Sequence, residues 1–153
     1  MNSKPSAYAA ALRMLSARAM SARELYDKLL AKEYTQDEAQ DALERCLDAR
    51  FLDDEQYAES LVRRCGSRYG RRMILHQLQQ HGIDRETAQR VLENWESPDA
   101  DEVLRRQLRG KTDEASLRRA CAALYRRGFS GEQIRGATER FREDFPEETE
   151  TDQ

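Results

Sequence analysis

Five arginines with no acidic residue among them mark the stretch of this sequence that is best suited to binding an anion. The stretch runs from Ser60 to Gly82, and Tyr69 lies among the arginines beside a glycine. A guanidinium group binds phosphates and carboxylates through charge-assisted hydrogen bonds, and a flat aromatic ring stacks on a base or packs on a partner. The stretch therefore indicates a surface for an anionic polymer or an acidic protein, with an ordinary solvated helix face as the alternative. The five arginines are Arg63, Arg64, Arg68, Arg71 and Arg72.

A second basic group follows later in the chain. Residues 103–142 contain eleven basic and four acidic residues, and residues 60–95 contain seven and three. The first 59 residues and the last eleven are acidic, and the whole chain has a net charge of −3. This balance opposes long-range attraction to free DNA, whereas a partner that is itself a protein–DNA assembly suits both the acidic and the basic segments. The arginines of the second group that we select as candidates are Arg118, Arg119, Arg126 and Arg127.

The residue types that usually carry catalysis or bind metals show no such pattern. The two histidines, His76 and His81, are five residues apart and fall on different faces of a helix. The three cysteines are widely spaced without a C-x-x-C pair, which indicates free thiols in a reducing cytoplasm. The Gly-Lys-Thr of residues 110–112 resembles the end of a phosphate-binding loop, but Arg105 stands where the first glycine belongs. We therefore expect a cytoplasmic binding protein that is not an enzyme and uses no metal or cofactor.

Helices are the elements that must position these side chains. Good helix formers dominate the composition, and only three prolines are present. No segment alternates apolar and polar residues as a strand does, and no apolar run is long enough to cross a membrane or to act as a secretory signal. Helix starts are indicated by capping boxes at Ser21, Thr35 and Ser130, and by Ser97 followed by Pro98. The sequence thus predicts an all-α fold.

Apolar spacing predicts the buried face of each helix. Asp53 and Asp54 precede one helix, where an N-cap and a first-turn acid belong. Gly82 and Gly128 are expected to end two later helices. The faces expected to be buried include Tyr57, Ala58, Leu61 and Val62 in one helix, and Ala39, Ala42, Leu43, Cys46 and Leu47 in another.

The apolar pattern recurs along the chain. Leu29, Leu78 and Leu124 occupy equivalent positions, with offsets of 49 and 46 residues, and Tyr8 corresponds to Tyr57 at the first offset. Self-similarity at this period is typical of tandem helical arrays. We predict three tandem three-helix repeats that form an elongated, curved array, followed by an acidic disordered tail. The repeats are residues 1–52, 53–96 and 97–145, and the tail is residues 146–153.

Two segments carry a family resemblance. The central one contains Phe51-Leu52-Asp53-Asp54, Tyr57-Ala58, and Gly70 with Ile74, Leu78 and Gly82-Ile83. The second is Tyr125-Arg126-Arg127-Gly128-Phe129. Both resemble motifs of the RecX regulatory proteins, and the resemblance covers roughly residues 7–141.

The resemblance implies a monomeric modulator of the RecA recombinase in DNA repair, recombination and the SOS response. Members of the family are built from tandem three-helix units and bind in the groove of the RecA filament on single-stranded DNA, spanning neighbouring subunits. There they usually inhibit ATP hydrolysis and strand exchange and promote filament shortening. Carried over by position, the matched surface residues are Tyr69, Arg71, Arg72, Arg126 and Arg127.

Two other interpretations stay open at this point. Three-helix units with short turns can be helix-turn-helix modules that bind duplex DNA, although Asp84-Arg85-Glu86 is acidic for the start of a recognition helix. A structural scaffold without a nucleoprotein partner is the other possibility. Under the leading interpretation, the partner- or DNA-binding residues are Arg63, Arg64, Arg68, Tyr69, Arg71, Arg72, Arg118, Arg119, Arg126 and Arg127.

Overall fold

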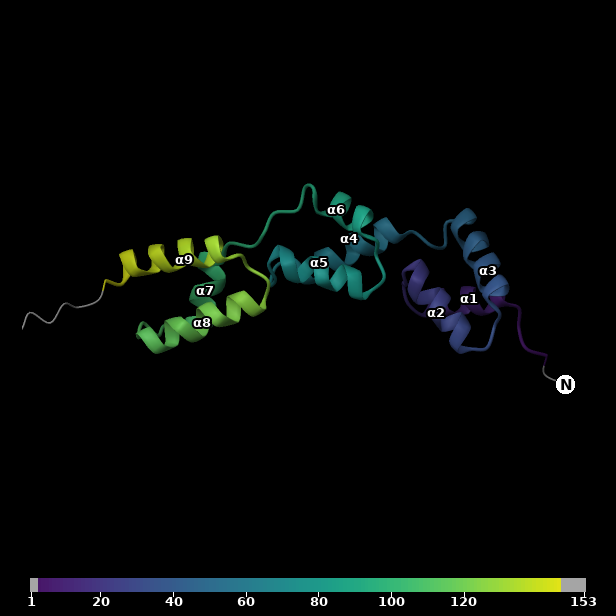
Figure 1. Ribbon diagram of the computed structural model, residues 1–153, viewed down its shortest axis with the longest axis horizontal. Coiled ribbons are helices and arrows are strands. Elements are labelled where there is room, and N and C mark those ends of the chain that lie inside the picture. Colours follow the sequence, from purple (N-terminus) through teal and green to yellow (C-terminus); the bar gives the residue numbers. More distant parts are fainter. Residues whose placement is uncertain (1–2, 147–153) are drawn as a thin grey trace, which may run out of the picture. The chain divides into compact units, whose positions relative to one another are not determined.

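The protein is built from α-helices throughout the part of the chain that the structure describes. The computed structural model describes residues 3–146, which contain nine helices and no strand (Figure 1). The all-α prediction is confirmed, whereas residues 147–153 of the predicted disordered tail lie outside the described residues. The helices are α1 (Ala7–Ala17), α2 (Ala22–Ala31), α3 (Gln36–Asp48), α4 (Asp54–Cys65), α5 (Arg71–Gln80), α6 (Arg85–Leu92), α7 (Ala100–Leu108), α8 (Glu114–Arg126) and α9 (Gly131–Asp144).

Most helix starts follow the capping signals in the sequence. Ser21, Thr35 and Ser130 each accept a hydrogen bond from the third helical N–H, and the Glu or Gln at that position accepts one in return. The start predicted at Ser97 and Pro98 is wrong, because α7 begins at Ala100. The Asp99 carboxylate caps it by accepting the Asp101 N–H at 3.0 Å, and aspartate caps as well as serine does. The Ser97 hydroxyl instead accepts a hydrogen bond from Gln133 Nε2 at 3.1 Å.

The described residues group into two compact units. Unit 1 contains residues 3–62 and Gln77–Trp95, and unit 2 contains Arg63–His76 and residues 96–146. Helices α4 and α5 therefore contribute residues to both units. The boundaries of the three repeats remain a prediction.

In unit 1, helices α1, α2 and α3 pack against one another around an apolar core (Figure 1). Leu25, Leu29, Ala39 and Cys46 are fully buried in this core. The prediction that Leu47 is buried is wrong, since its side chain is 48% exposed. Leu43 and Cys46 already fill the inward face of α3, and Leu47 lies about 100° further round the helix than Cys46. Unit 1 also contains the apolar face of α4, which is buried as predicted at Tyr57, Ala58, Leu61 and Val62.

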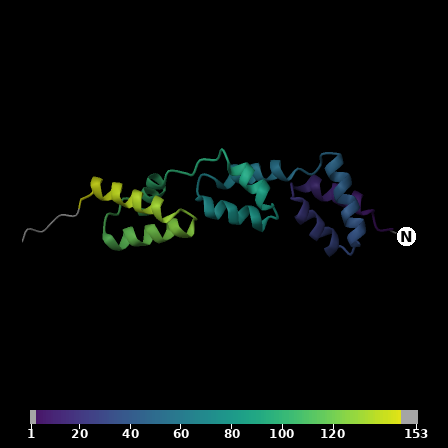
Figure 2. The same ribbon diagram turned by 45° about the horizontal axis from the view of Figure 1, so that its top comes forward.

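In unit 2, helices α7, α8 and α9 pack together in the same way (Figure 2). Phe129, in the turn between α8 and α9, is fully buried with Leu104 and Leu124. Its benzyl group anchors the turn, because full burial of a large side chain contributes about 1.5–3 kcal/mol. The C-terminal end of α8 is thereby held in a fixed place within the unit.

Each unit contains one contact between the start of one helix and the turn that follows another helix. We call these two contacts the first junction and the second junction. In the first junction, in unit 1, the Ser21 hydroxyl at the start of α2 donates to the His81 carbonyl after α5 at 2.5 Å. In the second junction, in unit 2, the Gly70 N–H before α5 donates to the Arg127 carbonyl after α8 at 2.8 Å. The helix N-terminus carries partial positive charge and the C-terminus partial negative charge, so both contacts are electrostatically favourable.

Candidate functional site

Two glycines make the second junction possible. A Cβ atom at Gly70 would lie 2.5 Å from the carbonyl carbon of Gly128 and 2.5 Å from the nitrogen of Phe129. A Cβ atom at Gly128 would lie 2.7 Å from the Met73 Cβ, and its φ of +93° is one that residues with side chains rarely adopt. Only glycine therefore lets the two backbones approach this closely. The contact places the basic residues around Gly70 beside those at the end of α8 (Figure 1).

The Arg72 side chain links the basic segment around Gly70 to the basic segment at the end of α8. Its guanidinium donates to the Tyr125 carbonyl in the last turn of α8, and it lies 4.6 Å from the centroid of the Tyr125 ring. A cation at this end of a helix is favoured by the helix dipole, and a cation over an aromatic face adds further attraction. Arg72 was predicted to bind a partner, but it also holds the second junction closed. Tyr125 is 59% exposed and was not among the predicted site residues, although it begins the motif of the third repeat.

The structure brings together some of the predicted residues and leaves others apart. Arg63, Arg64, Arg68, Arg71 and Arg126 are exposed, whereas Tyr69 and Arg127 are half-buried. All of these belong to unit 2, and each lies in the second junction or within seven residues of it in sequence. We call these seven residues, with Arg72, the basic surface.

Arg118 and Arg119 lie further along α8. Both are exposed, but seven residues separate Arg119 from Arg126, which is about 10 Å of helix. The Arg119 guanidinium donates to the Ser116 hydroxyl at 3.2 Å. They are therefore in the same unit as the basic surface without taking part in the second junction.

The arginines of the basic surface have no acidic partner among residues 3–146. Other arginines of unit 2 do: Arg140 contacts Asp101 at 2.5 Å, and Arg142 contacts Glu114 at 3.0 Å. The hydrogen bond from Arg140 lowers the pKa of the Asp101 carboxyl. The protein thus pairs Arg140 and Arg142 of α9 with its own acids and leaves the positive charge of the basic surface available to another molecule.

The first junction is built from different side chains. His81 Nδ1 lies 3.2 Å from the Tyr57 hydroxyl and 3.5 Å from Glu24 Oε2. Burial by itself raises the pKa of Glu24, but hydrogen bonds from Tyr57 and Ser21 and the nearby His81 lower it overall. His81 lies just after the last turn of α5, and His76 is exposed on α5. The network is a structural contact, and its only signal in the sequence is the capping box at Ser21.

Asp54 also contributes to unit 1 in a way that the sequence did not reveal. Asp53 caps α4 by accepting the Gln56 N–H at 3.1 Å, as predicted. The Asp54 carboxylate accepts the Ala22 N–H at the start of α2 at 2.8 Å. Burial raises the pKa of Asp54. This acid therefore joins α4 to α2 in addition to lying in the first turn of its own helix.

The described residues offer no metal centre. No group of three or more His, Cys, Asp or Glu side chains between residues 3 and 146 is placed to hold a metal ion. The three cysteines are free thiols. Cys46 is buried, which raises the pKa of its thiol, and Cys65 and Cys121 are half-buried. Among the described helices, none has the length and apolar character needed to cross a bilayer.

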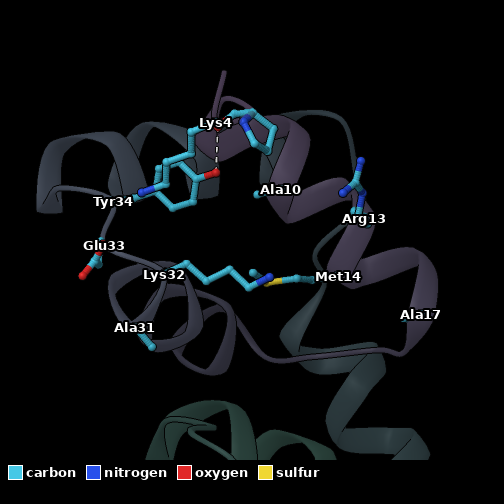
Figure 3. Close-up of a pocket in the computed structure, with 10 residues that line it drawn as sticks. Lys4, Ala10, Arg13, Met14, Ala17, Ala31, Lys32, Glu33 and Tyr34 are labelled. Carbon is cyan, nitrogen blue, oxygen red and sulfur yellow. Dashed lines mark hydrogen bonds between the residues drawn. The ribbon is translucent and has the colours of Figure 1, made fainter. Parts of the chain in front are cut away.

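A cavity lies in unit 1, between α1 and the end of α2. It has a volume of about 690 Å³ and is shown in Figure 3. The Tyr34 hydroxyl donates to the Pro5 carbonyl at 2.7 Å, and the Lys4 ammonium lies 4.0 Å from the centroid of the Tyr34 ring. Figure 3 shows the Lys32 side chain extending toward Met14. These contacts hold residues 4 and 5 against the bundle, and the lining residues do not form a catalytic set.

Comparison with known protein families identifies two matching family models. Residues 7–46 match the model described as RecX, first three-helix domain. Residues 53–92 match the model described as RecX, second three-helix domain. The matched ranges contain α1–α6 with only small differences at the ends.

Individual relatives and solved structures agree with these matches. The protein named Regulatory protein RecX from Xanthomonas axonopodis pv. citri (strain 306) is 40% identical over 134 residues, covering 84% of this chain and 83% of the relative. Its namesake from Trichlorobacter lovleyi is 37% identical over 148 residues, covering 88% and 94%. A crystal structure of RecX from Lactobacillus salivarius is similar with a TM-score of 0.73 and 25% identity, covering 88% of this chain and 94% of that one. A second crystal structure, of a regulatory protein RecX, has a TM-score of 0.74 at 20% identity, covering 87% and 70%, and supports the fold alone.

Proposed function

This chain belongs to the RecX family of regulatory proteins, and we propose that it regulates the RecA recombinase by binding the RecA filament on single-stranded DNA. Binding inhibits ATP hydrolysis and strand exchange and limits filament growth. The protein acts as a monomer in the cytoplasm, without catalytic activity, cofactor or metal of its own. The basic surface is the part of the molecule that contacts acids of RecA or phosphates of the DNA.

The observation that carries this proposal is the joining of the two basic segments at the second junction. The hydrogen bond from the Gly70 N–H to the Arg127 carbonyl places arginines from two distant parts of the chain in one unit. Because no acid among residues 3–146 pairs with them, their charge is available to an anionic partner. A protein that binds one state of the filament more tightly than another shifts the filament toward that state. Regulation therefore needs binding only, and no chemistry.

The test is RecA-dependent ATP hydrolysis on single-stranded DNA, titrated with this protein. The test variant is Arg68→Glu combined with Arg71→Glu, because both side chains are exposed and neither holds the second junction. Reversal of two charges at a contact surface should raise the concentration for half-maximal inhibition at least about tenfold, which corresponds to about 1.4 kcal/mol.

The matched control is Arg85→Glu combined with Arg135→Glu. These arginines are also exposed, and they lie on α6 and α9 outside the basic surface. The control changes the net charge by the same amount and should inhibit like the unmodified protein. Equal inhibition by the test variant and the control would show that the basic surface is not the contact.

A mobility-shift experiment separates this proposal from binding to duplex DNA. Helix α6, the second repeat's last helix, begins at Arg85 after the capping Asp84 and has Glu86 in its first turn. Acids at a helix N-terminus oppose the approach of phosphates. We expect little retardation of random duplex DNA at low salt without RecA, and co-sedimentation with RecA filaments. Tight duplex binding without RecA would favour a helix-turn-helix protein, and failure to sediment with filaments would favour a scaffold with another partner.

A further inference from the structure

Four cationic side chains line a groove at the turn between α7 and α8 in unit 2. The groove has a volume of about 270 Å³, and its cations are Arg109, Lys111, Arg119 and Arg126. No acidic side chain is part of its lining. Arg109 and Lys111 were not among the residues predicted to bind a partner. Like charges gathered on one small groove repel one another, so the arrangement is unfavourable until an anion enters.

Helix α8 supplies much of the lining of this groove. Ser116, Arg119, Ala120, Ala123 and Arg126 lie along one face of the helix, with spacings of three and four residues. The two alanines have short side chains, and they leave open space between the two arginines. By the helical rise, Arg119 and Arg126 start about 10 Å apart along the axis. This length accommodates more than one phosphate group.

Two local features position the cations. The Arg119 guanidinium donates to the Ser116 hydroxyl at 3.2 Å, which limits the directions in which the side chain can point. Arg109 ends α7 in the left-handed conformation, with φ +51°, a strained geometry for a residue with a side chain. Glu114, the acid closest to Arg119 in sequence, pairs with Arg142 at 3.0 Å, and the carboxylate of the next closest, Asp113, caps α8 by accepting the Ser116 N–H at 3.0 Å. Both acids are thus engaged elsewhere and lie outside the lining.

We propose that this groove is a binding site for a chain of two or more phosphate groups. Phosphates are the ligand that best matches four cations in a space this small, because each group carries charge and several acceptor oxygens without a long stem. Carboxylates of an acidic peptide bring one charge on each side chain, and four such side chains need more room. The same chemistry is present in free oligophosphates and in the backbone of single-stranded nucleic acid. Binding of phosphate groups at this groove does not require RecA.

Calorimetric titration of the full chain with tripolyphosphate at low salt tests this site. The groove variant is Arg109→Asn combined with Lys111→Gln, since asparagine tolerates the left-handed conformation that position 109 adopts. The control is Arg106→Gln combined with Arg135→Gln, which removes two exposed charges of unit 2 outside the groove lining. We expect the groove variant to bind tripolyphosphate at least about tenfold more weakly, and the control to bind it within about twofold of the unmodified chain.

A second variant and a competition experiment complete the test. Arg119→Gln, which leaves the turn unchanged, should weaken binding in the same direction. Competition with oligothymidylate identifies the source of the phosphates: displacement of tripolyphosphate assigns the nucleic-acid backbone, and no displacement assigns a free oligophosphate. Tripolyphosphate binding that is absent, that persists in both groove variants, or that falls equally in the control would overturn the proposal. Because RecA is absent throughout, this outcome is independent of the ATPase test described above.

Discussion

Replacing Gly70 with alanine should open the second junction. The new methyl group would meet the Gly128 carbonyl group and the Phe129 nitrogen, with the nearest carbon and nitrogen atoms at 2.5 Å. These are backbone atoms in a turn that the fully buried Phe129 side chain anchors. No rotation of a side chain can relieve the overlap, so the start of α5 must move away from the end of α8.

The size of the effect follows from two contributions. Overpacking a close contact costs about 1–3 kcal/mol. Separation also breaks the hydrogen bond from the Gly70 N–H to the Arg127 carbonyl, which contributes about 0.5–1.5 kcal/mol. The contact of Arg72 with Tyr125 is weakened at the same time. We therefore expect the free energy of opening this junction to fall by roughly 2–4 kcal/mol.

Hydrogen exchange followed by mass spectrometry measures this opening locally. A loss of about 2 kcal/mol should accelerate exchange of the Gly70 amide and its neighbours by about 30-fold, while peptides from α3 in unit 1 should be unaffected. The control is Gly131→Ala, because nothing lies within 4 Å of a Cβ atom there and the residue is the first of α9. It should be neutral or stabilising by up to about 1 kcal/mol. If hydrogen exchange of the peptides around residue 70 is the same in Gly70→Ala as in the unmodified chain, the close contact on which the basic surface depends is refuted.

Three further perturbations test other parts of the structure. Arg72→Ala should destabilise the second junction by about 1–2 kcal/mol, since it removes a charged hydrogen bond and a cation–π contact, and urea unfolding of the purified variant will measure this. The pKa of Glu24 is lower in the folded state than its ordinary value of 4.5, so its stabilising effect is present above pH 4.5 and is lost as the pH falls through the folded-state pKa. Glu24→Gln should therefore lose less stability than the unmodified chain as the pH falls below 4.5, as judged by urea midpoints. Thiol labelling should modify Cys65 and Cys121 in the folded protein and Cys46 only after unfolding, because Cys46 is buried and its pKa is raised.

Helix positions were predictable because their signals are local. A hydroxyl three residues before Glu or Gln determines a capping box from four residues of sequence, and all three predicted boxes, at Ser21, Thr35 and Ser130, are present. Apolar spacing likewise depends only on helical geometry, and it identified the buried face of α4. Where two local signals compete, the sequence alone does not decide. Asp99 rather than Ser97 caps α7, because the Ser97 hydroxyl is engaged by Gln133 from a distant part of the chain.

The composition of the basic surface was predictable, whereas its assembly was not. A run of arginines without acids can be read directly from the sequence, and so can glycines that end helices. The need for glycine at position 70 is different in kind, since it arises from a backbone 58 residues away that occupies the space of a side chain. The same is true of Arg72, whose partner is a backbone carbonyl with no signature in the sequence. The groove was not predictable either, because Arg109 and Lys111 converge with Arg119 and Arg126 only when α7 and α8 pack together.

The two junctions show how one arrangement can serve different purposes. Ser21 corresponds to Gly70 at the 49-residue offset of the repeat, and His81 corresponds to Arg127 at the 46-residue offset. In both places the residue before a helix donates a hydrogen bond to the carbonyl that precedes a left-handed glycine. The first junction is surrounded by Glu24, Tyr57 and His81, which satisfy one another. The second is surrounded by arginines that no acid within the described chain neutralises. The backbone contact is thus the common structural element, and it is the charge placed around each junction that makes the second one the candidate for binding another molecule.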